Sequence, residues 1–147
     1  MDATNTMKPS AEVLVLALIS MARMRFTLYM TNSRLTDPEV LEWRFPVLLE
    51  NFCIRPNSGG KGQHHGGNGV IRHLRFLEPM TAAILSSHRV VPPFGLQGGE
   101  AGALGRNYVE RSDGTVEELG STAAVEMNAG DVFIIETPGG GGFDVSS

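Results

Sequence analysis

The most direct candidates for chemistry in this chain are two adjacent histidines, His64 and His65. Imidazole is a common ligand of zinc and other transition metals, so the pair raises the question of a metal site. Neighbouring residues on an extended chain project to opposite faces, however, and no carboxylate or third histidine lies close by in the sequence. We therefore expect a surface loop here, and the sequence predicts neither a metal site nor a self-contained catalytic group.

A glycine-rich run, residues 59–62 (GGKG), precedes the histidines and has the composition of a phosphate-binding loop. A nucleotide loop has the spacing G-x-x-x-x-G-K-[ST], and a dinucleotide loop has G-x-G-x-x-G between a strand and a helix. Neither spacing occurs in this chain. Because a β-type segment follows the run, we predict that these glycines form tight connections between strands rather than an anion site.

The remaining polar candidates have structural explanations. His73 lies within a β-type segment and His88 adjoins a cation, so each is expected to be a hydrogen-bonded structural histidine. Asp131 ends a turn-forming stretch, where its carboxylate can cap backbone N–H groups. Cys53, the single cysteine, stands in an apolar stretch and is predicted to be a small buried side chain.

Composition limits the class of protein. The chain has 147 residues, of which 41% are hydrophobic and 19% charged, enough for one folded domain. Its formal net charge is −4 and it has no basic stripe, so nucleic-acid binding is not expected. A single cysteine cannot form an internal disulfide, so the sequence favours a reducing, cytoplasmic location.

The distribution of the 18 glycines divides the chain into two unlike parts, because none occurs before Gly59. Near the beginning, residues 13–19 (VLVLALI) form an apolar run that is too short to span a bilayer and lacks the positive leading segment of a signal peptide. If this run is helical, it is apolar on all faces, which favours burial or pairing with a partner. No membrane association is expected.

A short helix is predicted over residues 38–44. Asp37 can cap its free backbone N–H groups, and Pro38 occupies a first-turn position where the missing N–H is harmless. Pro46 then ends the helix, since it cannot donate a backbone hydrogen bond. Residues 47–54 (VLLENFCI), which follow, are compatible with a β-strand.

From residue 70 onward, short β-type runs alternate with turn signals, which is typical of a β-sandwich or a barrel. The strongest turn is Asp113-Gly114, a hairpin signal in which both central positions need positive φ. The predicted fold class is mainly β, sandwich or barrel-like, with a short N-terminal helical part. The predicted strands are residues 70–77, 82–85, 89–91, 107–112, 115–119, 123–127 and 132–137.

An ordered series of short motifs runs through residues 30–143. They are residues 30–34 (MTNSR), 36–39 (TDPE), 58–62 (SGGKG), 66–70 (GGNGV), 78–81 (EPMT), 93–96 (PFGL), 98–100 (GGE), 102–103 (GA), 130–131 (GD) and 137–142 (TPGGGG). In this order they resemble the C-terminal end of the hydantoinase B and 5-oxoprolinase family. Each motif is weak alone, whereas the ordered series is specific.

The resemblance implies an activity. Members of this family hydrolyse cyclic amides, and the 5-oxoprolinases use ATP and water to open 5-oxo-L-proline to L-glutamate, with release of ADP and phosphate. Phosphorylation of the lactam oxygen removes the amide resonance that resists water and creates a leaving group. ATP and a divalent metal are therefore implied for the complete enzyme, and no cofactor is expected in this segment.

The resemblance also implies a partner, a hydantoinase A-like ATP-binding portion that is fused or separate. The resemblance covers only the last part of the hydantoinase B-like portion of the family, so we expect this chain to be inactive alone. The alternative interpretation is a non-catalytic docking or subunit-contact domain, or a remnant of the family. A homo-oligomer is a further alternative, because a domain separated from a larger fold exposes an apolar surface through which copies of the chain can associate.

The first 29 residues depart from the family pattern. The family usually has two histidines, two residues apart, directly before the first motif, and here Thr27 and Tyr29 occupy those places. We therefore divide the chain into residues 1–29, an atypical leader that is helical or mis-joined, and residues 30–147, a C-terminal hydantoinase B/oxoprolinase-like β-rich domain.

Three residues of the first motif are expected to bind substrate, namely Thr31, Asn32 and Arg34. By the resemblance they face the shared active site, where Asn32 would hydrogen-bond an amide and Arg34 would hold a carboxylate in a bidentate fork. The structural alternative is that Asn32 and Arg34 fix the loop that enters the helix capped by Asp37.

Overall fold

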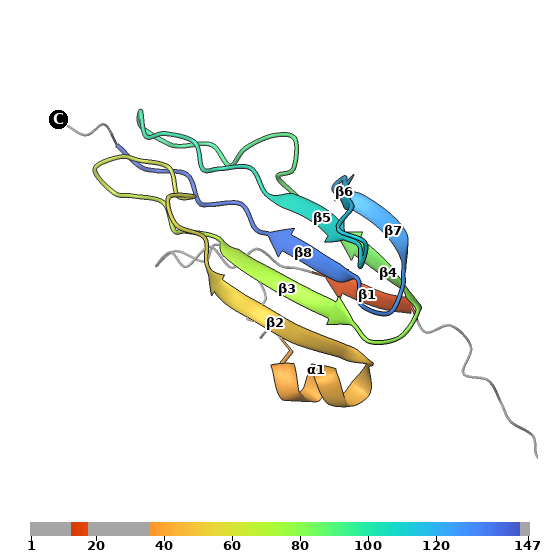
Figure 1. Ribbon diagram of the computed structural model, residues 1–147. Helices are drawn as coiled ribbons and strands as arrows, with labels where there is room; N and C mark the ends of the chain where they lie inside the picture. Colours follow the sequence, from red (N-terminus) through yellow and green to blue (C-terminus); the bar gives the residue numbers. More distant parts are fainter. Residues whose placement is uncertain (1–12, 18–35, 145–147) are drawn as a thin grey trace, which may run out of the picture.

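The computed structural model describes residues 13–17 and 36–144, with side chains in the second range only. Within these ranges the chain forms two β-sheets and one short helix (Figure 1). The elements are β1 (Val13–Ala17), α1 (Pro38–Arg44), β2 (Val47–Ile54), β3 (Val70–Phe76), β4 (Met80–Leu85), β5 (Arg106–Glu110), β6 (Val116–Leu119), β7 (Thr122–Met127) and β8 (Val132–Glu136).

The helix α1 begins and ends as predicted. The Asp37 carboxylate accepts the backbone N–H of Glu39 at 2.9 Å, and Pro38 occupies the first turn. Leu41 is the buried residue of the helix. No helix in the described part of the chain is long and apolar enough to cross a membrane.

The larger sheet has the order β2-β3-β8-β5-β6, and all of its strand pairs are antiparallel. The predicted hairpin at Asp113-Gly114 joins β5 to β6, but only Gly114 has a positive φ, 87°. The loop is wider than a two-residue turn, because the Arg111 N–H donates to the Thr115 carbonyl oxygen at 2.8 Å. The hairpin is therefore confirmed, and its expected turn type is wrong.

The smaller sheet has the order β1-β4-β7. β4 pairs antiparallel with β7, and β1 pairs parallel with β4 from Val13 opposite Thr81 to Ala17 opposite Leu85. This part of the early apolar run is therefore a strand rather than a helix.

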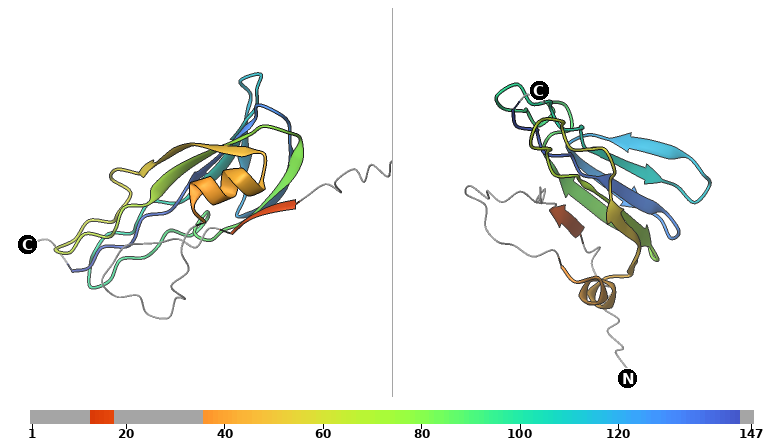
Figure 2. Two further views of the ribbon diagram at one scale, coloured as in Figure 1. Left: turned by 90° about the horizontal axis from the view of Figure 1, so that it is seen from below. Right: turned by 90° about the vertical axis from the view of Figure 1, so that its left-hand side faces the viewer.

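The hydrophobic core lies between the two sheets (Figure 2). Leu74 and Phe76 of β3 and Phe133 and Ile135 of β8 are fully buried on the larger sheet. The smaller sheet contributes buried side chains from β4 and β7, including Ala82. The mainly β fold class is confirmed as two facing sheets that do not close into a barrel.

Three extended segments, residues 58–69, 93–105 and 137–144, continue beyond the sheets and run side by side (Figure 1); we call them the glycine bundle. They are joined by backbone hydrogen bonds. The Gly60 N–H donates to the Gly140 carbonyl oxygen at 2.8 Å, and the Gly142 N–H donates to the Glu100 carbonyl oxygen at 2.9 Å. Residues 137–144 therefore contact both of the other segments.

The contacts within the glycine bundle repeat every three residues. A Cβ added to Gly139 would lie 1.7 Å from the Ser58 carbonyl oxygen, and one added to Gly142 would lie 2.2 Å from that of Lys61. Three residues per turn in extended backbone is the period of a polyproline II-type helix. The predicted structural role of the glycines is confirmed, although they pack extended segments together rather than forming tight turns.

Two sequence predictions are wrong. Residues 89–91 do not form a strand; they belong to the loop that leads into Pro92-Pro93. Cys53 is exposed, because β2 is an edge strand whose second half is not covered by the core. The other predicted strands agree with the structure to within two residues at each end.

Candidate functional site

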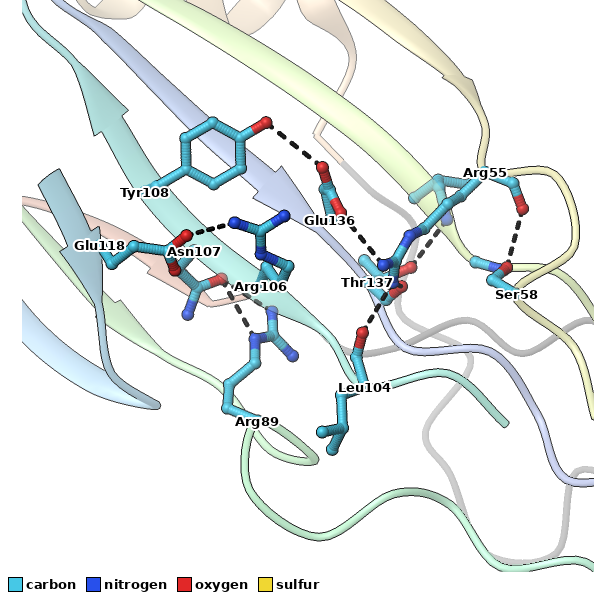
Figure 3. Close-up of polar contacts among 12 residues, drawn as sticks. Arg55, Ser58, Arg89, Leu104, Arg106, Asn107, Tyr108, Glu118, Glu136 and Thr137 are labelled. Atoms are coloured by element: carbon cyan, nitrogen blue, oxygen red, sulfur yellow. Dashed lines mark hydrogen bonds and ion pairs between the residues drawn. The ribbon is translucent and has the colours of Figure 1, made fainter. Parts of the chain in front are cut away.

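A network of polar side chains lies where the larger sheet meets the glycine bundle (Figure 3). We call it the polar junction and define it by Arg55, Arg89, Asn107, Glu136 and Thr137. Arg55 follows β2, Asn107 lies in β5, and Glu136 and Thr137 lead from β8 into the bundle. Arg89 belongs to the loop after β4.

Arg55 connects three segments of the chain. Its Nη2 forms an ion pair with Glu136 Oε2 at 3.1 Å, and its Nη1 donates to the carbonyl oxygens of Leu104 and Thr137 at 2.7 and 3.2 Å (Figure 3). The Tyr108 hydroxyl donates to the other Glu136 oxygen at 3.2 Å. Burial and the neighbouring carboxylate raise the pKa of Tyr108, so its hydroxyl stays protonated and holds Glu136 in place.

Thr137 and Ser58 fix the start of the bundle. The Thr137 Oγ1 accepts the Val70 N–H at 2.7 Å, and the Thr137 N–H donates to the Val70 carbonyl oxygen at 2.8 Å. The Ser58 hydroxyl donates to the Arg55 carbonyl oxygen at 2.7 Å and accepts the Gly69 N–H at 2.8 Å. Both hydroxyl groups are buried, so these bonds replace water that the backbone has lost.

Arg89 is a half-buried cation that bonds to neutral groups. Its Nε and Nη2 donate to the Asn107 side-chain oxygen at 3.2 and 2.8 Å, and its Nη1 donates to the Ser87 carbonyl oxygen at 2.6 Å. Burial, followed by repulsion from Arg55, lowers the pKa of Arg89 from its usual value. Within the polar junction, Arg55 is therefore paired with a carboxylate, whereas Arg89 bonds only to neutral groups of the described residues.

A third arginine, Arg72, lies on the core-facing side of β3, opposite Phe52 of β2 and Ile135 of β8. Its residue is only 4% exposed, and its Nε has no hydrogen-bond acceptor. Burial lowers the pKa of the Arg72 guanidinium. Side chains alternate between the two faces of a strand, so residues 70–76 place Arg72 on the same face as Leu74 and Phe76. The face on which Arg72 lies was therefore predictable from the sequence.

A pocket of about 260 Å³ opens on the outer face of the larger sheet. Arg75 pairs there with Glu50, and the Arg111 Nη1 pairs with Asp131 Oδ2 at 2.8 Å. Because these cations already have internal partners, we assign the pocket wall to fold stability. The lining residues are Glu50, His73, Arg75, Glu110, Arg111, Ser112, Gly114, Gly130 and Val132.

Two predictions for individual polar residues are confirmed. The Asp131 carboxylate accepts the Asn128 N–H at 2.9 Å and so caps its own turn. His88 has its Nδ1 3.0 Å from the Val91 carbonyl oxygen, a structural hydrogen bond. His73 lies in the pocket wall and forms no side-chain hydrogen bond within the described ranges.

The histidine pair lies where the sequence predicted. His64 and His65 are both exposed, and the backbone of His64 exchanges two hydrogen bonds with that of Phe143. Among residues 13–17 and 36–144, no group of three or more His, Cys, Asp or Glu side chains could hold a metal ion. Thr31, Asn32 and Arg34, the predicted substrate-binding residues, lie outside the described residues.

Comparison with known proteins gives consistent matches. The profile of the hydantoinase B/oxoprolinase family matches residues 23–144. The chain is 49% identical over 115 residues to 5-oxoprolinase 1 of Arabidopsis thaliana and 51% identical over 106 residues to the 5-oxoprolinase of Saccharomyces cerevisiae. These alignments cover 78% and 71% of this chain and 9% and 8% of the two relatives.

A more distant relative is the caprolactamase subunit beta of Pseudomonas jessenii, which is 30% identical over 112 residues. This alignment covers 73% of the chain and 19% of the relative. The chain therefore spans less than a fifth of the length of each of these three relatives. On the family match and these identities, the chain belongs to the hydantoinase B/oxoprolinase family.

Proposed function

We propose that this chain acts as the C-terminal part of an ATP-dependent cyclic-amide hydrolase of the 5-oxoprolinase type and is inactive alone. The carrying observation is the 49% and 51% identity to two 5-oxoprolinases, of which the chain spans 9% and 8%. The reaction of the complete enzyme would be 5-oxo-L-proline, ATP and water to L-glutamate, ADP and phosphate. It would serve glutathione metabolism in the cytoplasm, in keeping with the single, unpaired cysteine.

ATP and a divalent metal do not fit the described residues. A phosphate site in the glycine bundle would need free backbone N–H groups, but those of Gly60, Gly66, Gly140 and Gly142 already donate to carbonyl oxygens at 2.8 to 2.9 Å. The described ranges also hold no cluster of three metal-ligating side chains. By the family resemblance, both cofactors would bind in the hydantoinase A-like portion of the complete enzyme.

The substrate contacts of this chain would come from Thr31, Asn32 and Arg34. Arg34 would bind the carboxylate of 5-oxo-L-proline through its planar fork, and Asn32 would hydrogen-bond the lactam amide. The family match supports this proposal, because it covers residues 23–144 and so includes all three positions.

The hydantoinase A-like portion would be fused to this chain or form a separate subunit. Both arrangements have support among the relatives. The two 5-oxoprolinases are far longer than the segment matched here, and the caprolactamase relative is named as a subunit. The partner would activate the lactam ring, and this chain would contribute substrate binding and a contact surface for the partner.

A second candidate function is a non-catalytic docking domain. The observation that favours it is the exposure of large apolar side chains on the loop between β4 and β5, in particular Val90, Val91, Phe94 and Leu96. Several exposed apolar side chains on one loop favour contact with another protein. The same surface would allow a second copy of the chain to bind.

The decisive experiment measures L-glutamate formed from 5-oxo-L-proline by the chain alone and by the chain with a separately produced protein that contains the hydantoinase A-like portion and the rest of the hydantoinase B-like portion, each with and without ATP. We expect glutamate only in the mixture with ATP, and its loss in Arg34→Met. ATP-dependent glutamate formation by the chain alone would contradict the proposal. Binding of the two proteins without any product would favour the docking function.

A further inference from the structure

The main unexplained feature of the described fold is that Arg72 is buried without an ion-pair partner. Arg55, Arg75, Arg106 and Arg111 each form an ion pair with a carboxylate, with Glu136, Glu50, Glu118 and Asp131 as the respective partners. Arg72 is more buried than any of these four, and it has no ion pair or side-chain hydrogen bond within the described ranges.

This arrangement is energetically costly, because the buried Nε of Arg72 has lost water and gained no acceptor, and the charge has no carboxylate partner among the described residues. Its chemistry also defines the missing group. The two Nη atoms of Arg72, which unlike Nε are not sealed from solvent, form a planar fork that matches the two oxygens of a carboxylate. The guanidinium of Arg72 therefore requires an anionic, planar acceptor that the described residues do not contain.

The surroundings of Arg72 indicate how that acceptor arrives. Residues opposite each other in neighbouring strands project to the same face, so Phe52 lies beside Arg72 and Ile54 lies beside Val70, on the core-facing side of the larger sheet. At the other end of β2 this face is closed, with Val47 only 1% exposed. Phe52 and Ile54, in contrast, are 51% and 68% exposed. The apolar face is therefore uncovered next to the unpaired cation.

We infer that Arg72 binds the carboxylate of an aspartate or glutamate side chain of the hydantoinase A-like partner, whose apolar neighbours cover Phe52 and Ile54. This inference rests on the proposed function for the identity of the partner. A side chain fits better than a free carboxylate ligand, because the residue is only 4% exposed and the uncovered apolar strip extends along β2 beyond it. Docking of the partner would supply the counter-ion of Arg72 and at the same time cover the exposed side chains of Phe52 and Ile54.

The test compares three substitutions in the full chain. Arg72→Met keeps the length of the side chain and removes the charge, and Arg72→Lys keeps the charge without the fork. Arg75→Met is the matched control, because Arg75 lies on the same strand, faces the opposite side of the sheet and has an internal partner in Glu50. Affinity for a separately produced hydantoinase A-like protein and the thermal unfolding midpoint of the chain alone are measured for each.

We expect Arg72→Met to weaken binding about thirtyfold or more, since the partner carboxylate loses its counter-ion. Arg72→Lys should bind with intermediate affinity, and Arg75→Met should bind like the unmodified chain. Without the partner, Arg72→Met should raise the unfolding midpoint by about 4 °C, because it removes an uncompensated buried charge. If Arg72 served only to stabilise the fold, Arg72→Met would instead lower the unfolding midpoint.

Three results would overturn the inference. Equal binding of Arg72→Met and the unmodified chain would reject it while leaving the proposed partner intact. Failure of the unmodified chain to bind would reject the partner itself, and the inference with it. A rise in the unfolding midpoint with 5-oxo-L-proline or acetate that is absent in Arg72→Met would assign the carboxylate to a small ligand instead of a protein side chain.

Discussion

The side-chain oxygen of Asn107 binds the guanidinium of Arg89 by accepting from two of its nitrogens, Nε at 3.2 Å and Nη2 at 2.8 Å. The Asn107 side-chain nitrogen donates in turn to the Ser86 hydroxyl at 2.9 Å and to the Gly120 carbonyl oxygen at 3.0 Å. One fully buried amide therefore ties β5 to the loop after β4 and to the turn before β7.

Replacing Asn107 by leucine should lower the free energy of unfolding by about 3 kcal/mol, because Arg89 and the Gly120 carbonyl group would each lose a partner away from water. Urea unfolding at neutral pH measures the change. Glu110→Gln, at an exposed position on the same strand, should stay within about 0.5 kcal/mol of the unmodified chain. Equal midpoints for Asn107→Leu and Glu110→Gln would contradict the role given to the amide.

Replacing Gly139 by alanine should destabilise the chain by at least about 3 kcal/mol, because the added Cβ would lie 1.7 Å from the Ser58 carbonyl oxygen and two backbones would have to separate. The matched control is Gly120→Ala, whose nearest neighbour, the Thr122 carbonyl oxygen, is 4.0 Å away. Thermal unfolding of both variants checks the expectation. If the two changes were equally mild, the close packing of the glycine bundle would be wrong.

Replacing Asp131 by asparagine should reduce the dependence of stability on acid pH. Burial alone would raise the pKa of this carboxyl, but the hydrogen bonds from the Asn128 N–H, Arg111 and the Ser112 N–H outweigh burial and lower the pKa below its usual value. A lowered pKa in the folded state stabilises the protein above the unfolded-state pKa of about 4, and this contribution is lost as the pH falls through the folded-state value.

We therefore expect Asp131→Asn to cost about 2 kcal/mol at pH 7 and progressively less as the pH falls below about 4. Urea midpoints at pH 7, 5, 4 and 3 measure this difference. A constant difference between the two proteins across this range would show that the carboxylate charge does not contribute.

Removing residues 1–29 tests the proposed leader. β1 lies outside the 23–144 family match, whereas its partner β4 lies inside it. We expect the chain that starts at Met30 to keep one cooperative unfolding transition and to self-associate more readily, because β4 then presents an open edge. Circular dichroism during heating and light scattering follow the two effects. Loss of the cooperative transition would make the first 29 residues integral to the domain.

The sequence predicted those parts of the fold that local chemistry determines. The helix α1 begins and ends at the expected residues because Asp37 and Pro46 act on their immediate neighbours. The turn around Asp131 was predictable for the same reason. Val90 and Val91 have β-branched side chains, but residues 89–91 have no strand to pair with in the described part of the chain, and pairing depends on distant segments.

Burial and the candidate sites were harder to predict, because they depend on which strands lie at an edge. Cys53 stands in an apolar run, but only the strand order shows that β2 has one neighbour and an uncovered second half. The contacts of Arg55 and Arg89 join residues far apart in sequence, and no local pattern indicates them. The roles of Thr31, Asn32 and Arg34 came from family resemblance and stay predictions.

The glycine bundle has a consequence for the order of folding. Its segments are distant in the chain, because Ser58 lies between β2 and β3, whereas Gly139, which it meets, follows β8. Closing such long loops is slow, and contacts absent from the transition state mainly govern the rate of unfolding. We expect the sheets to form first and the bundle to close last, so that it determines how long the native state persists rather than how fast it forms.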